Sequence, residues 1–189
     1  YPIAAATRGL EGVVMTEMSA LVDAGAVAFS DDGRTIMDSG VMRRVLEYSR
    51  LVEVPVIVHC EDRTLVGQGV VNEGAMSTRL GLPGNPAIAE TVHVARDVIL
   101  AELTGAHLHV AHVSTVGGVA SIRVARERGI NVTAEVTPHH LTLTADLIAG
   151  RADPVSAMLS PYDANAKVAP PLREREDCDR LLEALIDGT

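Results

Sequence analysis

The stretch Pro55-Val56-Ile57-Val58-His59-Cys60-Glu61-Asp62 is a short apolar run that leads directly into a polar cluster. The same pattern recurs along the chain. Other runs rich in Val, Ile and Ala lead into Ser30-Asp31-Asp32-Gly33, His112-Val113-Ser114-Thr115 and Thr137-Pro138-His139-His140. In a parallel barrel all strands point the same way, so the residues just past their carboxyl ends meet at one mouth, where such enzymes keep their chemistry. The pattern therefore predicts an α/β barrel with a metal-dependent site at that mouth.

Strand and helix patterns alternate along the chain. Apolar runs that suit strands buried on both faces predict strands at residues 1–6, 26–30, 54–60, 107–113 and 130–137. Between and after them, helices are predicted at residues 16–24, 39–51, 86–104, 117–128 and 177–186, and several of these close on a glycine. Two irregular stretches, residues 70–84 and 150–173, are expected to form walls and lids of the site.

This alternation fits part of a (β/α)8 barrel, with about five βα units present. A doubly wound open sheet is the rival fold, but the loops after the strands contain no Gly-x-Gly-x-x-Gly or Gly-Lys-Ser/Thr run. A complete barrel takes eight units and about 250 residues. The chain has 189 residues, starts within a strand pattern at Tyr1, and stops at Thr189 where another strand should follow. We therefore expect residues 1–189 to be the central part of one barrel domain, truncated at both ends.

The composition is ordinary for one globular domain, with 47% hydrophobic and 22% charged residues. A net charge of −9 argues against a nucleic-acid partner, whose footprint is a basic patch. No stretch approaches the ~20 apolar residues of a membrane span, and none has the pattern expected of a basic, apolar, cleavable leader. Cys60 and Cys178 are too few to form a disulfide framework, which favours a soluble protein in a reducing cytoplasm. Cys60 itself is expected to be a small buried apolar residue.

Three residues at neighbouring strand ends are candidate metal ligands: Asp32, His59 and His112. One βα unit separates Asp32 from His59, and one unit enlarged by the insertion separates His59 from His112. Carboxylate and imidazole are both ligands of zinc. Asp31 competes with Asp32, because adjacent side chains of an extended segment point to opposite faces, and spacing alone does not choose between them.

The other histidines are given different roles. His107 and His109 lie on the strand face opposite to His112 and are interpreted as structural. His93 lies within the helix predicted at residues 86–104 and is expected to be a packing or helix-surface residue. For His139 and His140, a role beside the metal or substrate and a role in anchoring a helix or loop stay equally open.

Taken together, the motifs resemble those of the type I dihydroorotases, a branch of the amidohydrolase superfamily. The resemblance runs along nearly the whole chain and rests on several blocks in the right order. These blocks are Ala28-Phe29-Ser30-Asp31-Asp32-Gly33, Val58-His59-Cys60-Glu61-Asp62, Asn72-Glu73-Gly74, Ala95-Arg96-Asp97, His109-Val110-Ala111-His112-Val113-Ser114-Thr115, Thr133-Ala134-Glu135-Val136-Thr137-Pro138-His139-His140-Leu141 and Pro170-Pro171-Leu172-Arg173.

The resemblance implies a distorted eightfold barrel that binds one or two zinc ions. It implies reversible hydrolysis of dihydroorotate to N-carbamoyl-L-aspartate, a step of de novo pyrimidine synthesis. The family pattern assigns the metal-bridging carboxylate to Asp32 and ligands of the second metal to His59 and His112. It also places Ala169 at a substrate-contact position where the family usually has Asn. Such a contact survives if the main chain makes it, and is in doubt if the amide side chain does.

Some family motifs are absent from this chain. The first-strand His-x-His, the Arg that follows it, and the eighth-strand Asp-His-Ala-Pro with the catalytic aspartate would lie before Tyr1 and after Thr189. No catalytic acid or base is therefore assigned within residues 1–189. We predict that this piece alone is inactive and unstable, because an unclosed barrel exposes edge strands.

Three alternatives stay open. A hydantoinase or allantoinase would share the barrel and the reaction type, but these relatives usually carry a fourth-strand lysine, and a Cys-Pro pair where this chain has Thr137-Pro138. A second alternative is a dihydroorotase-like chain that has lost its ligands and serves as a structural partner of aspartate transcarbamoylase. Retention of Asp32, His59 and His112 argues against it. The third is a metal-free α/β domain. Association with a transcarbamoylase or as a homodimer is not decided by the sequence.

Overall fold

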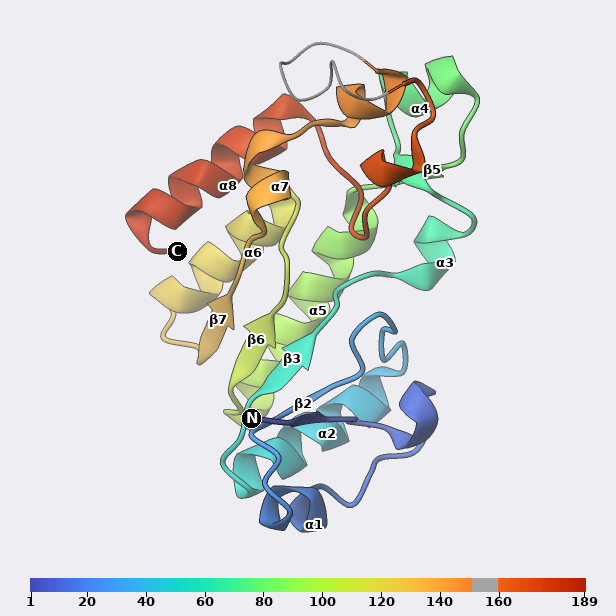
Figure 1. Cartoon of the computed structure of the whole chain (residues 1–189). Helices are drawn as coiled ribbons and strands as arrows, with labels where there is room; N and C mark the ends of the chain where they lie inside the picture. The colour runs from blue at the N-terminus through green and yellow to red at the C-terminus, as the bar shows by residue number, and fades with distance from the viewer. Residues whose placement is uncertain (151–159) are drawn as a thin grey trace.

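A five-stranded parallel sheet forms the centre of the computed structural model, which describes residues 1–150 and 160–189 (Figure 1). All five strands that the sequence predicts are present, and each lies inside its predicted range. They are β1 (Ile3–Ala4), β2 (Ala28–Ser30), β3 (Val56–Val58), β6 (Leu108–Val110) and β7 (Val132–Ala134).

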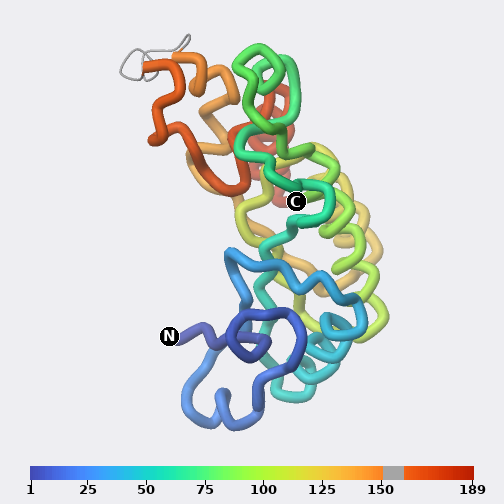
Figure 2. Tube along the Cα trace, turned by 90° about the vertical axis from the view of Figure 1, so that its right-hand side faces the viewer, coloured from blue at the N-terminus to red at the C-terminus, as the bar shows by residue number. Residues whose placement is uncertain are grey.

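The strand order distinguishes a barrel segment from a doubly wound sheet. The order is β1-β2-β3-β6-β7, so the strands of this sheet lie side by side in chain order. A doubly wound sheet reverses its order at a switch point and carries helices on both faces. Here helices α2 (Ser39–Leu51), α5 (Ile88–Thr104) and α6 (Val116–Glu127) lie on one side of the sheet (Figure 2). The sheet is therefore a partial barrel with helices outside.

The two faces of the sheet differ in burial, as expected for a barrel with helices on its outside. Phe29, Val56, Leu108 and Val132 pair across four neighbouring strands and are at most 4% exposed. They belong to the main hydrophobic cluster, which includes Met42, Val45 and Leu46 of α2. Because side chains alternate along a strand, the next row, which includes Ile57, His109 and Thr133, faces the other way and is only partly covered. That second face is the barrel lumen.

The other two predicted helices are also present. They are α1 (Met18–Asp23) and α8 (Arg175–Asp187), each within two residues of its predicted range. Short elements that the sequence does not predict lie near the ends of β1 and β7. These are η1 (Arg8–Leu10), α7 (Pro138–Thr142) and η2 (Ala145–Ala149).

The insertion at residues 70–84 is more regular than the sequence indicates. After α3 (Arg63–Val66), it forms β4 (Val71–Asn72) and α4 (Ala75–Leu80), and it pairs β4 in parallel with β5 (Gly84–Asn85). A Cβ atom at Gly84 would lie 2.7 Å from the Cβ of Glu73, so a glycine is needed there. Of the second stretch, residues 151–159 lie outside the described part, and the rest contains η4 (Ala164–Ala166).

Two other predictions concern membranes and cysteines. Within the described residues, no helix is both long and apolar enough to cross a bilayer. Cys60 and Cys178 are both buried, and each is a free thiol. Burial, followed by the nearby Asp97 carboxylate, raises the pKa of Cys60 well above its ordinary value. The prediction that Cys60 is a small buried residue is confirmed.

Helix α5 carries an unusual buried face. Its buried residues recur every three or four positions, as expected for a helix packed on a sheet. Three of them are titratable. The buried set is Ala89, Glu90, His93, Val94, Asp97, Val98, Ala101 and Thr104.

His93 is the buried residue of α5 that lacks any hydrogen-bond partner among the described residues, at both ring nitrogens. Burial, followed by Arg96, lowers its pKa to about 4. The folded pKa lies below the ordinary value of 6.5, so the unfolded chain binds this proton more readily between those values. The free energy of unfolding is therefore undiminished by His93 above pH 6.5, and it falls as the pH drops from 6.5 toward 4.

We expect His93→Met to raise the free energy of unfolding by about 1–3 kcal/mol at neutral pH, because two buried polar atoms without partners are removed. The variant should also lose less stability than the natural protein between pH 7 and pH 5. Urea unfolding at both pH values measures the two effects. An unchanged pH dependence would show that His93 is not buried in its neutral form.

Candidate metal centre

Asp32, His59 and His112 come together at the carboxyl ends of β2, β3 and β6. Each offers one ligand atom, and these three atoms all lie within 4.8 Å of one another. The strands deliver them there because all three run in the same direction and are neighbours or next neighbours in the sheet. Spacing along the sequence and position in space therefore point to the same three residues.

The distances within this cluster suit a shared metal ion. His59 Nδ1 lies 3.1 Å from His112 Nε2, and His112 Nε2 lies 3.5 Å from Asp32 Oδ1. Two ligand atoms that are each about 2.05 Å from a tetrahedral zinc ion lie about 3.3 Å apart. The two imidazole rings meet edge to face, with centroids 4.9 Å apart. The donor set of one carboxylate and two imidazoles therefore fits zinc in its chemistry, and the distances from His112 to the other two ligand atoms match the spacing of a zinc site.

The structure separates the roles of the two adjacent aspartates. Asp31 is buried, and its Oδ1 accepts hydrogen bonds of 2.9 Å from the backbone N–H groups of Ala6 and Thr7. Its Oδ2 accepts a further hydrogen bond from the Thr7 hydroxyl. The side chain of Asp32 is 63% exposed and faces His112. Asp31 thus ties the end of β1 to β2, while Asp32 belongs to the cluster.

Glu61 lies beside the imidazole of His59, on the side away from the cluster. Its Oε2 lies 3.7 Å from His59 Nε2, on the side of the ring opposite to His112. Its Oε1 accepts a 2.8 Å hydrogen bond from the side-chain amide of Asn85 on β5. His59, and to a smaller extent Asn85, holds the pKa of Glu61 below its ordinary value. A carboxylate behind a histidine ligand fixes the ring and its tautomer, so the insertion contributes to the site through Asn85.

His139 and His140 follow β7 at the same end of the sheet. The Thr137 hydroxyl contacts both rings, 2.9 Å from His139 Nε2 and 2.7 Å from His140 Nδ1. His140 is buried, its Nε2 lies 3.0 Å from the Pro170 carbonyl, and burial lowers its pKa to about 4. For His140 the structure supports the loop-anchoring role. Ala169, the residue before Pro170, is exposed.

His107 and His109 share one strand face, as their parity predicts. The prediction that this face lies opposite to His112 is wrong, because His112 has a φ of +39° and lines the same cavity as His109. His107 Nε2 and His109 Nδ1 lie 2.9 and 2.8 Å from the same Thr133 hydroxyl. His109 also lines an open cavity of about 490 Å³ together with Asp32 and His112. The interpretation of His107 and His109 as structural is supported by their shared partner, and His109 in addition borders the space beside the cluster.

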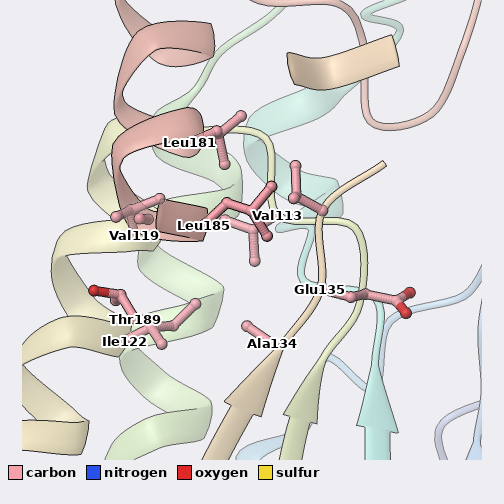
Figure 3. A pocket seen from close by; sticks show the side chains of 10 residues that line it. Val113, Val119, Ile122, Ala134, Glu135, Leu181, Leu185 and Thr189 are labelled. Carbon is pink, nitrogen blue, oxygen red and sulfur yellow. The ribbon is translucent and has the colours of Figure 1, made fainter. Parts of the chain in front are cut away.

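A smaller apolar hollow of about 80 Å³ lies between α6, α8 and the end of β7 (Figure 3). It is lined mainly by aliphatic side chains such as Val119, Ile122 and Leu181, and Glu135 points away from it. None of the three clustered residues lines it. We therefore assign it no part in the chemistry.

Sequence reasoning missed the residues that hold the cluster in place. Glu61 was noticed only as part of a motif, and Glu90 of α5 was not singled out. Glu90 is 3% exposed and accepts hydrogen bonds from the loop that follows His112. It lies four positions before Val94 on the buried stripe of α5, so an acid in register with apolar residues was the available signal.

The fold and the site together define a class of protein. Parallel strands in chain order, helices outside, and an aspartate with two histidines at the carboxyl ends are the features of a metal-dependent amidohydrolase barrel. Solved structures agree on the fold. D-hydantoinase (dihydropyrimidinase) from Thermus sp. is 24% identical with a TM-score of 0.72, and the match covers 98% of this chain and 40% of that one. L-hydantoinase (dihydropyrimidinase) from Arthrobacter aurescens is 26% identical with a TM-score of 0.72, covering 97% and 40%.

Sequence comparison narrows the class to one family. Residues 1–117 match the dihydro-orotase-like family, so the chain belongs to it. It is 52% identical over 188 residues to the dihydroorotase of Caldanaerobacter subterraneus subsp. tengcongensis, and 50% identical over 189 residues to that of Syntrophus aciditrophicus. Both matches cover 100% of this chain. The chain spans 41% and 42% of the length of these relatives. The family resemblance inferred from the motifs is confirmed.

Proposed function

We propose that this chain contributes part of the metal site of a zinc-dependent cyclic amide hydrolase that interconverts dihydroorotate and N-carbamoyl-L-aspartate. The observation that carries the proposal is the convergence of Asp32, His59 and His112 within 4.8 Å at the barrel mouth. The relatives named dihydroorotase, at 52% and 50% identity, support the choice of substrate. The proposal places the natural protein in pyrimidine synthesis in the cytoplasm.

Asp32, His59 and His112 would hold the metal. A zinc ion bound by them would supply a Lewis acid, which polarises a carbonyl group and lowers the pKa of water toward ~7. Both effects would assist hydrolysis of an unstrained amide at neutral pH. The three ligands from this chain would leave at least one position on such a metal for a further ligand, water or substrate.

The chain's own residues prepare this site in two ways. Glu61 holds the His59 ring from behind, which keeps Nδ1 directed at His112 and Asp32. The open cavity of about 490 Å³ beside Asp32 and His112 gives a small cyclic amide room to approach the cluster. Ala169 is retained as a proposed substrate contact, through its main chain. Binding to aspartate transcarbamoylase, or to a second copy, follows from the resemblance alone and stays a prediction.

A hydantoinase is the second candidate, because the solved neighbours carry that name. Their identity to this chain is 24% and 26%, whereas the dihydroorotases reach 52% and 50%. The shared fold does not choose the substrate. We therefore favour dihydroorotate.

The test uses the natural protein that contains this chain. We expect it to hydrolyse dihydroorotate in preference to hydantoin and allantoin, to lose that activity on treatment with a chelator, and to regain it with zinc. The absorbance of the dihydroorotate ring measures the substrate, and a colour assay measures N-carbamoyl-L-aspartate. Together they follow the reaction in both directions. Preference for hydantoin would establish the second candidate, and full activity in the chelated protein would refute a metal-dependent reaction.

A further inference from the structure

We propose that Glu90, on helix α5, is a positioning residue of the metal centre that holds His112 in the conformation needed for metal binding. The inference rests on the ligand assignment of the proposed function. It adds a residue that lies outside the cluster and acts on it through the backbone.

His112 has a backbone that needs support. Its φ is +39°, in the left-handed region that residues with side chains rarely adopt. Holding a residue there costs free energy, which the surrounding structure must supply. The residues on both sides of His112 are tied to neighbouring strands, because the Ala111 N–H donates to the Val58 carbonyl at 3.1 Å and the Val113 N–H to the Glu135 carbonyl at 2.9 Å.

Glu90 fixes the next two residues. Its Oε1 accepts hydrogen bonds from the Ser114 and Thr115 N–H groups, both at 3.0 Å, and from the Thr115 hydroxyl at 2.7 Å. Its Oε2 accepts from the Ser114 N–H at 3.2 Å and from the Ser114 hydroxyl. One buried carboxylate therefore accepts from all the hydrogen-bond donors of Ser114 and Thr115. This fixes the path of the backbone that follows His112.

The charge of Glu90 is compensated where it lies. Helix α6 begins at Val116, so the carboxylate sits at its amino end, where the helix dipole favours a negative charge. The buried guanidinium of Arg173 donates to the Ser114 hydroxyl at 3.1 Å and contributes positive charge from the other side. A Cβ at Gly118 would lie 2.8 Å from Glu90 Oε1, so a glycine makes room for the carboxylate. The site for Glu90 is therefore built for a carboxylate.

A residue that only joins α5 to α6 would leave metal binding unchanged, so metal affinity is the informative quantity. We would compare Glu90→Gln with Glu102→Gln in the natural protein that contains this chain. Glu102 is on the same helix, but its carboxylate is exposed and pairs with Arg128. Zinc affinity is measured by competition with a chromophoric chelator, and the geometry of the ligands by the visible spectrum of bound Co²⁺.

Glu90→Gln is expected to lower zinc affinity about 10- to 100-fold, as is typical when a group that orients a ligand is changed, and to alter the Co²⁺ spectrum. Glu102→Gln is expected to match the natural protein in both. Equal zinc affinity and spectrum in Glu90→Gln would overturn the inference and leave the proposed function standing. Absence of zinc binding by the natural protein would overturn both.

Ser114→Ala serves if Glu90→Gln does not fold. It removes one hydroxyl donor to Glu90 and the oxygen that accepts from Arg173, and it keeps the Glu90 carboxylate with its backbone hydrogen bonds from Ser114 and Thr115. A severalfold loss of zinc affinity is expected. A loss of thermal stability with unchanged zinc affinity would show a purely structural role.

Discussion

Replacing His112 with alanine should lower kcat/KM for cyclic amide hydrolysis by roughly 1,000-fold, because the metal is worth about 4 kcal/mol or more of transition-state stabilisation. His112 Nε2 is the atom nearest to both other members of the cluster, 3.1 Å from His59 Nδ1 and 3.5 Å from Asp32 Oδ1. Its loss leaves two ligands from this chain. The effect is measured as kcat/KM on dihydroorotate with zinc in excess.

The matched control for His112→Ala is His107→Gln. His107 is on the same strand segment, but its ring contacts Thr133 rather than the cluster. We expect this variant to remain within a few-fold of the natural protein. Equal activity of His112→Ala and the natural protein, at equal bound zinc, would refute the ligand assignment.

The adjacent aspartates should give opposite results. Asp31→Ala is expected to reduce the free energy of unfolding by about 3–5 kcal/mol, because it leaves two backbone N–H groups and a hydroxyl without a buried partner. Asp32→Ala should change stability little in the metal-free protein, since its side chain is largely exposed. It should instead abolish tight zinc binding and activity.

Urea unfolding of the metal-free protein and zinc titration measure the two quantities separately for each variant. Each aspartate is thus the control for the other, with the same chemistry one residue apart. A large loss of stability in Asp32→Ala, together with normal zinc binding, would exchange the two roles.

Most of the fold could be predicted because its signals are local. Helix α2 begins and ends where the sequence places it. Asp38 caps its start by accepting a hydrogen bond from the Val41 N–H at 2.7 Å, and a new strand begins just after Pro55. The strands of the main sheet are apolar runs long enough to recognise. Strands β4 and β5 have two residues each, as β1 does, but they contain Asn72, Gly84 and Asn85 and so form no apolar run.

The candidate metal ligands could be predicted from the sequence, but the residues that hold them in place could not. Asp32, His59 and His112 were found because parallel strands bring their carboxyl ends together. The choice between Asp31 and Asp32 required the structure, because the sequence does not show which side chain accepts hydrogen bonds from the Ala6 and Thr7 N–H groups. Glu90 was missed because an acid in a helix is ordinarily exposed, and its partners lie 24 and 25 residues further along the chain.

Anomalous X-ray diffraction at the zinc absorption edge, on crystals of the natural protein, tests the central claim most directly. We predict a zinc ion at the carboxyl ends of β2, β3 and β6, with His59 Nδ1, His112 Nε2 and an Asp32 carboxylate oxygen about 2.0–2.2 Å away. Zinc bound elsewhere, with these three side chains free, would contradict it.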